Sequence, residues 1–218
     1  MKTLIYFTVI FQFVTAIIAL IKYNKFKNSY LKYFIILTIY VGLNDFLIMI
    51  YTMNFNVQSN LILYHIKNAI NFGVLFYIYK KAFDKQWITK LANVFLIVYG
   101  LLIIVELFLL KVDYFSKTQV LPYIFGGTCV IFLSLYYFYN LLKSNKIIQF
   151  DRDLLFWIST GLFIYYIAYI PFKVSQNYFA SSKTISSVFY IRPVVTILVN
   201  CIFIIGFLWS KTEKQVSS

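Results

Sequence analysis

Long apolar stretches separated by short polar segments fill almost the whole chain. A helix needs about 20 consecutive, predominantly apolar residues to cross a hydrocarbon core of about 30 Å, and seven stretches reach that length. They lie near residues 3–21, 31–53, 61–80, 91–110, 120–142, 154–173 and 187–209. The pattern predicts an all-α, polytopic membrane protein with seven transmembrane helices.

The polar segments between these stretches are short, and none is long enough to form a domain with its own core. The sequence contains no internal repeat, low-complexity linker or shift in composition that would mark a boundary. We therefore expect a single seven-helix bundle over residues 1–210, followed by a short cytoplasmic tail over residues 211–218.

The composition supports the same class. Hydrophobic residues make up 61% of the chain and charged residues 12%, whereas soluble domains carry about 25% charged residues. The formal net charge of +13 could suggest a nucleic acid partner. Because the basic residues are spread over several separate loops, they are more typical of anchors beside anionic lipid head groups. The expected partner is the lipid bilayer, and no nucleic acid.

Lysine and arginine alternate in density from loop to loop, which predicts the orientation, since cytoplasmic loops carry the excess. Thirteen basic residues fall on one side: Lys22, Lys25, Lys27, Lys32, Lys80, Lys81, Lys85, Lys90, Lys143, Lys146, Arg152, Lys211 and Lys214. The other side has five: Lys2, Lys111, Lys117, Lys173 and Lys183. This bias places the N-terminus outside and the C-terminus in the cytoplasm.

The first stretch also resembles a signal peptide, because Lys2 precedes an apolar run that contains the small-residue sequence Val14-Thr15-Ala16. Cleavage there would leave six helices and put the first lysine-rich loop outside, against the charge bias. The run is also long for a signal peptide. We expect a retained helix.

Polar residues within the apolar stretches are the most informative about function. Ionisable groups cost about 2.5–3.5 kcal/mol each near the centre of a membrane on insertion scales, so they normally face the inside of a bundle. The candidates for a ligand-binding or buried polar cluster are Asp45, His65, Lys67, Asn68, Asn71, Glu106 and Arg192. Given the predicted orientation, all of the ionisable members lie in the outer half of the membrane.

The third stretch has a polar side. At 100° per residue, His65, Lys67, Asn68 and Asn71 fall within an arc of about 160°, which should face inward. Leu63, Ile66 and Ile70 lie on the other side, toward lipid or a neighbouring helix.

Two interpretations of this cluster stay open. In the first, it forms an outward-open pocket, in which Lys67 or Arg192 meets an anionic ligand, or Asp45 or Glu106 meets a cation. In the second, the groups form buried pairs and hydrogen bonds that hold the helices in register, or the charged ones extend to the interface.

Catalytic and metal-binding patterns are missing from the sequence. There is no HExxH, GxSxG or CxxC motif, and a single histidine cannot build a multi-histidine metal site. Cys129 and Cys201 both lie within apolar stretches and imply no disulfide framework. We expect no enzymatic activity, metal or cofactor.

A family resemblance rests on several short segments. They are Tyr30-Leu31-Lys32-Tyr33-Phe34, Asn44-Asp45, the segment from Tyr64-His65 to Asn68, Phe156-Trp157-Ile158 through Gly161 to Tyr165, and Asn200. They resemble uncharacterised small seven-helix membrane proteins of Bacteroidota. These are similar in turn to the membrane-embedded N-terminal regions of some sensor histidine kinases. The resemblance implies a location in the bacterial inner membrane and a sensory role.

These observations predict a non-enzymatic inner-membrane protein, receptor-like or accessory, with an outward-facing polar cluster for a small polar ligand or a membrane protein partner. A small-solute transporter is the first alternative. A structural subunit of a larger membrane complex is the second.

Overall fold

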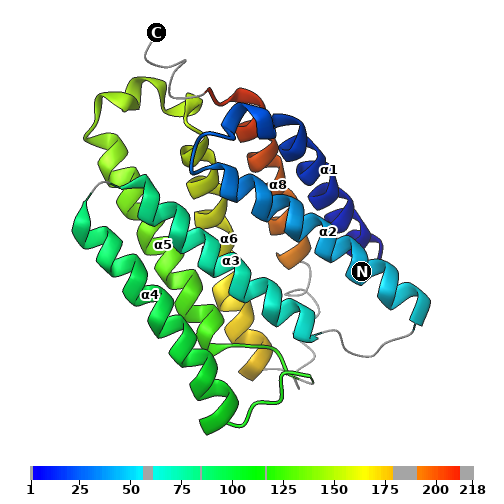
Figure 1. Ribbon diagram of the computed structural model, residues 1–218. Helices are drawn as coiled ribbons and strands as arrows, with labels where there is room; N and C mark the ends of the chain where they lie inside the picture. The colour runs from blue at the N-terminus through cyan, green and yellow to red at the C-terminus, as the bar shows by residue number, and fades with distance from the viewer. Residues whose placement is uncertain (1, 56–60, 84, 116, 179–190, 212–218) are drawn as a thin grey trace.

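The computed structural model describes residues 2–55, 61–83, 85–115, 117–178 and 191–211 (Figure 1). The regular elements of these residues are all helical. They are α1 (Lys2–Phe26), α2 (Lys32–Phe55), α3 (Leu61–Ala82), α4 (Gln86–Ile104), α5 (Leu121–Leu142), α6 (Leu154–Tyr178) and α8 (Ile191–Trp209). One π-helical turn, η1 (Val105–Leu109), extends α4, and a 3₁₀ helix, η2 (Asn145–Arg152), joins α5 to α6.

Within the residues that the structure describes, seven helices are long and apolar enough to cross a membrane, which confirms the predicted all-α class and the predicted number of spans. The chain is a polytopic membrane protein. Three boundaries differ most from the prediction: α1 continues to Phe26 and carries Lys22 and Lys25, α4 begins at Gln86 and includes Lys90, and α6 continues to Tyr178. Lysine can end an apolar pattern without ending a helix, because its long side chain can carry the charge from the helix to the interface.

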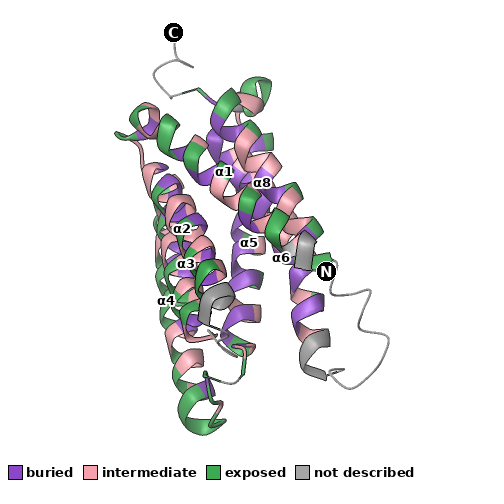
Figure 2. Ribbon diagram, turned by 90° about the vertical axis from the view of Figure 1, so that its right-hand side faces the viewer, coloured by how far each residue is buried: buried purple, intermediate pink, exposed green. Residues whose placement is uncertain are grey.

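The helices form one bundle in which α5 and α6 are the most buried spans and α4 the least. Helix α1 packs along α2 and α8, α6 packs along α5 and α8, and α3 packs against α4, α2 and α5 (Figure 1). Figure 2 shows buried positions along α5 and α6, whereas the outer helices alternate between buried and exposed positions. An apolar exposed face is expected for helices that contact lipid.

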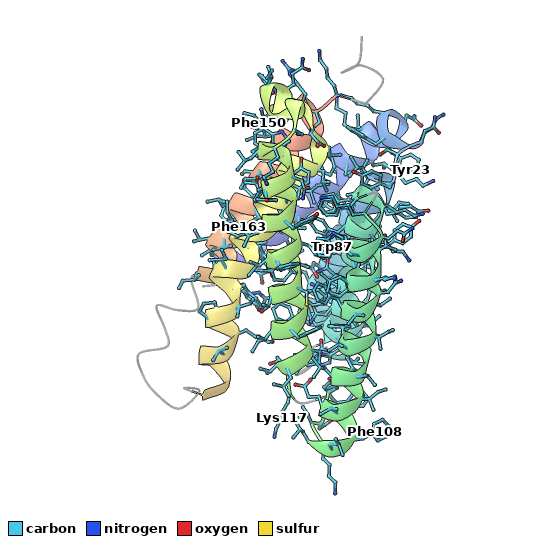
Figure 3. The ribbon with its side chains drawn as sticks, turned by 90° about the vertical axis from the view of Figure 1, so that its left-hand side faces the viewer. Tyr23, Trp87, Phe108, Lys117, Phe150 and Phe163 are labelled. Atoms are coloured by element: carbon cyan, nitrogen blue, oxygen red, sulfur yellow. The ribbon has the colours of Figure 1, made fainter. Side chains whose placement is uncertain are left out.

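The two ends of the bundle differ in charge. We call one the lysine-rich end. It carries the connections 27–31, 83–85 and 143–153, together with Lys211, whose backbone N–H donates to the Arg152 carbonyl oxygen over 2.8 Å. The opposite end carries the connection 110–120. Tyr23 and Phe150 lie at the lysine-rich end in Figure 3, and Phe108 and Lys117 lie at the opposite end.

Small residues allow the closest helix contacts. Gly42 of α2 faces α1 so closely that a methyl group there would lie 2.8 Å from the Ala16 side chain and 3.1 Å from the Gln12 carbonyl oxygen. Thr15 and Ala16 are buried. Helix packing therefore accounts for the small residues that resemble a cleavage site in the sequence.

Two further glycines lie where α6 and α8 pack closely together. A methyl group at Gly161 would collide with the Phe203 ring, and one at Gly206 would lie 2.6 Å from the Trp157 side chain. Close approach of this kind is typical of membrane helix interfaces, where small residues let backbones come together. Gly161 of α6 therefore serves packing against α8.

Replacing Gly42 by alanine should destabilise the protein by about 1–3 kcal/mol, since overpacking of a tight interface has that typical cost. Gly100 of α4 is the matched control, because no atom lies within 4 Å of a methyl group built there. Alanine at Gly100 should leave stability unchanged or raise it, through better helix propensity. Thermal unfolding in mild detergent measures both. Equal effects of the two substitutions would contradict the packing described.

Candidate functional site

An ion pair joins two of the residues singled out by the sequence. Asp45 of α2 and Lys67 of α3 lie 2.6 Å apart, Oδ1 to Nζ, and their side chains are only 10% and 12% exposed. The Lys67 ammonium also lies 4.5 Å from the centre of the Tyr64 ring. Each charge is thus compensated within the bundle, as burial in a membrane requires.

The predicted polar side of α3 is confirmed. His65 is buried and Lys67, Asn68 and Asn71 are half-buried. Leu63, Ile66 and Ile70 are 39%, 49% and 39% exposed, so this face points out of the bundle. The helical periodicity of the sequence alone identifies which side of α3 faces inward.

A partly open cavity of about 140 Å³ lies between the helices, with its wall contributed by α1, α2, α3, α5, α6 and α8. Ten polar side chains line it: Gln12, Thr38, Lys67, Asn68, Asn71, Tyr123, Tyr165, Tyr166, Thr196 and Asn200. The apolar part of the wall includes Phe34, Leu37, Leu162, Val199 and Phe203. An apolar cavity of about 150 Å³ accommodates benzene, so the space suits a small molecule.

Several polar groups of the wall are held in place. The Asn71 side-chain amide donates to the Tyr166 hydroxyl over 2.9 Å, and the Asn200 amide donates to the Thr196 carbonyl oxygen over 2.8 Å. The rings of Tyr165 and Tyr169 stack with centroids 5.3 Å apart. The cavity thus combines an ammonium group, amides and phenol hydroxyls, which can orient a polar ligand among aromatic surfaces.

Two more cations lie near this wall, both toward the opposite end. Arg192 is exposed as a residue, and its guanidinium lies 6.0 Å and 5.8 Å from the ring centres of Tyr64 and Tyr169. The Lys173 side chain is buried, with its ammonium 5.5 Å from the centre of the Tyr123 ring. Arg192 precedes the lining residue Thr196 by one helical turn, and Lys173 faces the lining residue Tyr123, so both cations lie next to the cavity.

Glu106 has a different environment from the other predicted residues and does not line the cavity. It lies in η1, is 2% exposed, and accepts hydrogen bonds from the Tyr114 hydroxyl over 2.6 Å and from the backbone N–H groups of Val120 and Leu121 over 3.0 and 3.1 Å. Burial, together with the hydrogen bond to Glu106, raises the pKa of Tyr114, which keeps its hydroxyl a donor. Glu106 holds the connection 110–120 and the start of α5.

His65 of α3 contacts the same connection. Its Nε2 lies 3.1 Å from the Lys117 carbonyl oxygen, and its ring lies 4.3 Å from that of Tyr114, centroid to centroid. Of the seven predicted residues, Lys67, Asn68 and Asn71 line the cavity, and Asp45 reaches it through Lys67. Arg192 lies beside it, whereas His65 and Glu106 anchor a loop.

The sequence analysis missed several wall residues. Gln12 is the only amide in the first apolar stretch, and that isolation could have identified it. Lys173 was assigned to a loop, although it follows Tyr166 and Tyr169 at helical spacing on one side of α6. The wall tyrosines could not have been found, because 20 tyrosines occur in the chain and nothing in their spacing separates packing from a cavity.

Comparison of the chain with protein-family models, curated proteins and solved structures gives no match. Cys129 and Cys201 are free, and the described residues contain no group of three histidine, cysteine, aspartate or glutamate side chains that could hold a metal ion. Function must therefore be inferred from the cavity and its surroundings.

Proposed function

We propose that the protein binds a small polar ligand in the cavity and acts as a receptor-like or accessory protein of the bacterial inner membrane, without catalysing a reaction. The observation that carries this proposal is the Asp45–Lys67 pair, which places an ammonium group on the wall of a polar cavity inside a membrane bundle. Ionisable groups in such positions mark ligand or ion sites by default. The resemblance to sensor kinase membrane regions agrees with a sensory role.

The orientation we propose has the lysine-rich end in the cytoplasm. Three connections and Lys211 gather there, where anionic lipids attract basic side chains. Asp45, Lys67, Lys173 and Arg192 then belong to the half of the membrane that faces outward.

A fusion experiment tests this orientation. A reporter fused after Lys214 should behave as cytoplasmic, and the same reporter inserted after Lys117 should behave as periplasmic. The charge difference between the two ends is the physical reason. Periplasmic activity of the Lys214 fusion would overturn the assignment.

Aromatic packing between the cavity and the lysine-rich end supports a receptor over a transporter. The ring of Phe34 lies 5.0 Å from that of Phe203 and 6.1 Å from that of Phe207, and Phe207 is fully buried. Phe34 is near the start of α2 and Phe207 near the end of α8, so these rings separate the cavity from the lysine-rich end. A transporter must open its site to both faces, whereas a receptor can keep one face closed.

The accessibility of a cavity thiol distinguishes a receptor from a transporter. In a background with Cys129→Ala and Cys201→Ala, Asn71→Cys places one thiol on the cavity wall. Lys117→Cys and Lys143→Cys serve as references for the two sides of the membrane. A charged, membrane-impermeant thiol reagent should modify the Asn71→Cys thiol when it is added on the side where it modifies Lys117→Cys. It should not do so when it is added on the side where it modifies Lys143→Cys. Modification from both sides would favour a small-solute transporter, and modification from the Lys143 side alone would contradict an outward-facing site.

A further inference from the structure

We infer that the ligand carries an anionic group, a carboxylate or a phosphate, bound beside the cavity by Lys67, Lys173 and Arg192. This inference rests on the proposed function and adds the chemical class of the ligand. It follows from an excess of cations over available carboxylates around the wall.

The carboxylates near these cations are already engaged. Asp45 is paired with Lys67, and the oxygens of Glu106 accept hydrogen bonds from Tyr114 and from the start of α5. Within the part of the chain that the structure describes, no carboxylate oxygen lies within 4.0 Å of the Lys173 ammonium or the Arg192 guanidinium. Two cations therefore lack an ion-pair partner among the described residues.

These cations also act on one another. Arg192 is close enough to Lys67 and to Lys173 for its charge to repel both. Asp45 attracts Arg192 as well as Lys67, and Glu106 attracts Lys173, so two carboxylates face three cations. Tyrosine rings face all three cations, and a ring attracts a cation through its π-system. That attraction leaves the net positive charge unchanged, so the group remains complementary to an anion.

The other ligand classes fit less well. A cationic ligand would have to displace Lys67 from Asp45 while facing Lys173 and Arg192. A neutral ligand would leave Arg192 and Lys173 with only Asp45 and Glu106 as counter-charges, neither of them within 4.0 Å. An anion can contact Lys67 together with Asp45. It can also serve as a close counter-charge for Lys173 and Arg192.

Two sources of such an anion match the geometry. The cavity volume of about 140 Å³ suits a small soluble carboxylate or phosphate. Because Arg192 is exposed as a residue, the phosphate of an anionic lipid is the second source. The binding chemistry is the same for both.

Thermal unfolding of the full chain in neutral detergent tests the inference. With Cys201→Ala in every sample, the remaining Cys129 is buried, so a thiol-reactive dye reports unfolding. Benzoate and phenyl phosphate should raise the midpoint by roughly 5 °C near saturation, whereas benzyl alcohol and benzylammonium should not. In the lipid arm, phosphatidylglycerol is compared with phosphatidylcholine in mixed micelles. A shift with the small anions assigns a soluble source, and a shift with phosphatidylglycerol alone assigns a lipid.

Lys173→Met and Arg192→Met identify the binding groups. Without an anion, each variant should unfold at the same temperature as the wild type or higher, since a poorly compensated charge has been removed. With the anion, each should lose at least half of the shift. Lys117→Met, whose side chain is exposed at the same end, is the matched control and should keep the whole shift.

Three results would overturn the inference: equal stabilisation by neutral and anionic probes, a full shift in both variants, or no shift with any anion or with phosphatidylglycerol. One further result separates failure of this inference from failure of the proposed function. If benzyl alcohol stabilises the wild type and Thr38→Phe abolishes this effect, the cavity binds a ligand and only the assignment of an anion is wrong.

Discussion

Replacing Asp45 by asparagine is expected to lower the free energy of unfolding in mild detergent by about 3–5 kcal/mol, since removing one partner of a buried ion pair leaves the other charge uncompensated. Lys67 lies 2.6 Å from Asp45 with a side chain only 12% exposed. It would keep the Tyr64 ring as a neighbour and lose its counter-charge.

The double substitution makes this test specific. Asp45→Asn together with Lys67→Met should be more stable than the sum of the two single losses predicts, because no unpaired charge remains. Asp151→Asn is the matched control: Asp151 pairs with Arg152 over 3.5 Å, with side chains 37% and 36% exposed, and such pairs contribute at most about 1 kcal/mol. Strictly additive losses at Asp45 and Lys67 would show that the two residues do not act as a pair.

The second large effect is expected at Glu106. Substitution by alanine should cost about 3 kcal/mol or more, because hydrogen bonds to a charged group contribute about 1.5–3 kcal/mol each and the buried donors lose their acceptor. Three donors converge on this carboxylate: the Tyr114 hydroxyl and the backbone N–H groups of Val120 and Leu121. The connection 110–120 and the first turn of α5 should loosen together.

Chemical denaturation of the full chain in detergent measures the loss, and hydrogen exchange locates it. Glu106→Gln is the matched variant, since an amide oxygen can still accept from the backbone N–H groups. It should lose less stability than Glu106→Ala. If Glu106→Ala unfolds at the wild-type denaturant concentration with unchanged exchange near Val120, the anchoring role is wrong.

Apolar stretch length was enough to predict seven spans, and helical spacing was enough to predict which side of α3 faces inward. Both properties are local, so the sequence carries them. Glu106 could not be assigned in this way, because its partners Val120 and Leu121 follow 14 and 15 residues later and meet it only after the chain turns. The sequence grouped Glu106 with the other ionisable residues because their predicted depths in the membrane agree. That grouping did not take into account the turn that brings Val120 and Leu121 to Glu106.

The cavity itself could not be predicted from the sequence. Its wall combines residues of six helices, and their meeting depends on close contacts such as Gly42 against α1. Lys173 shows the same difficulty on a smaller scale. Counting it as a loop residue suited the charge bias, whereas α6 continues to Tyr178 and the buried lysine lies over the Tyr123 ring.

The most direct measurement is native mass spectrometry of the full chain, purified in mild detergent, as wild type and with two matched substitutions. Thr38 lines the cavity and Thr128 is exposed on α5, and each hydroxyl donates over 2.8 Å to the carbonyl oxygen four residues earlier. Wild type and Thr128→Phe should retain a bound small molecule that Thr38→Phe loses. A wild type that carries only protein partners, or a Thr38→Phe variant that retains the same molecule, would contradict a ligand site in the cavity.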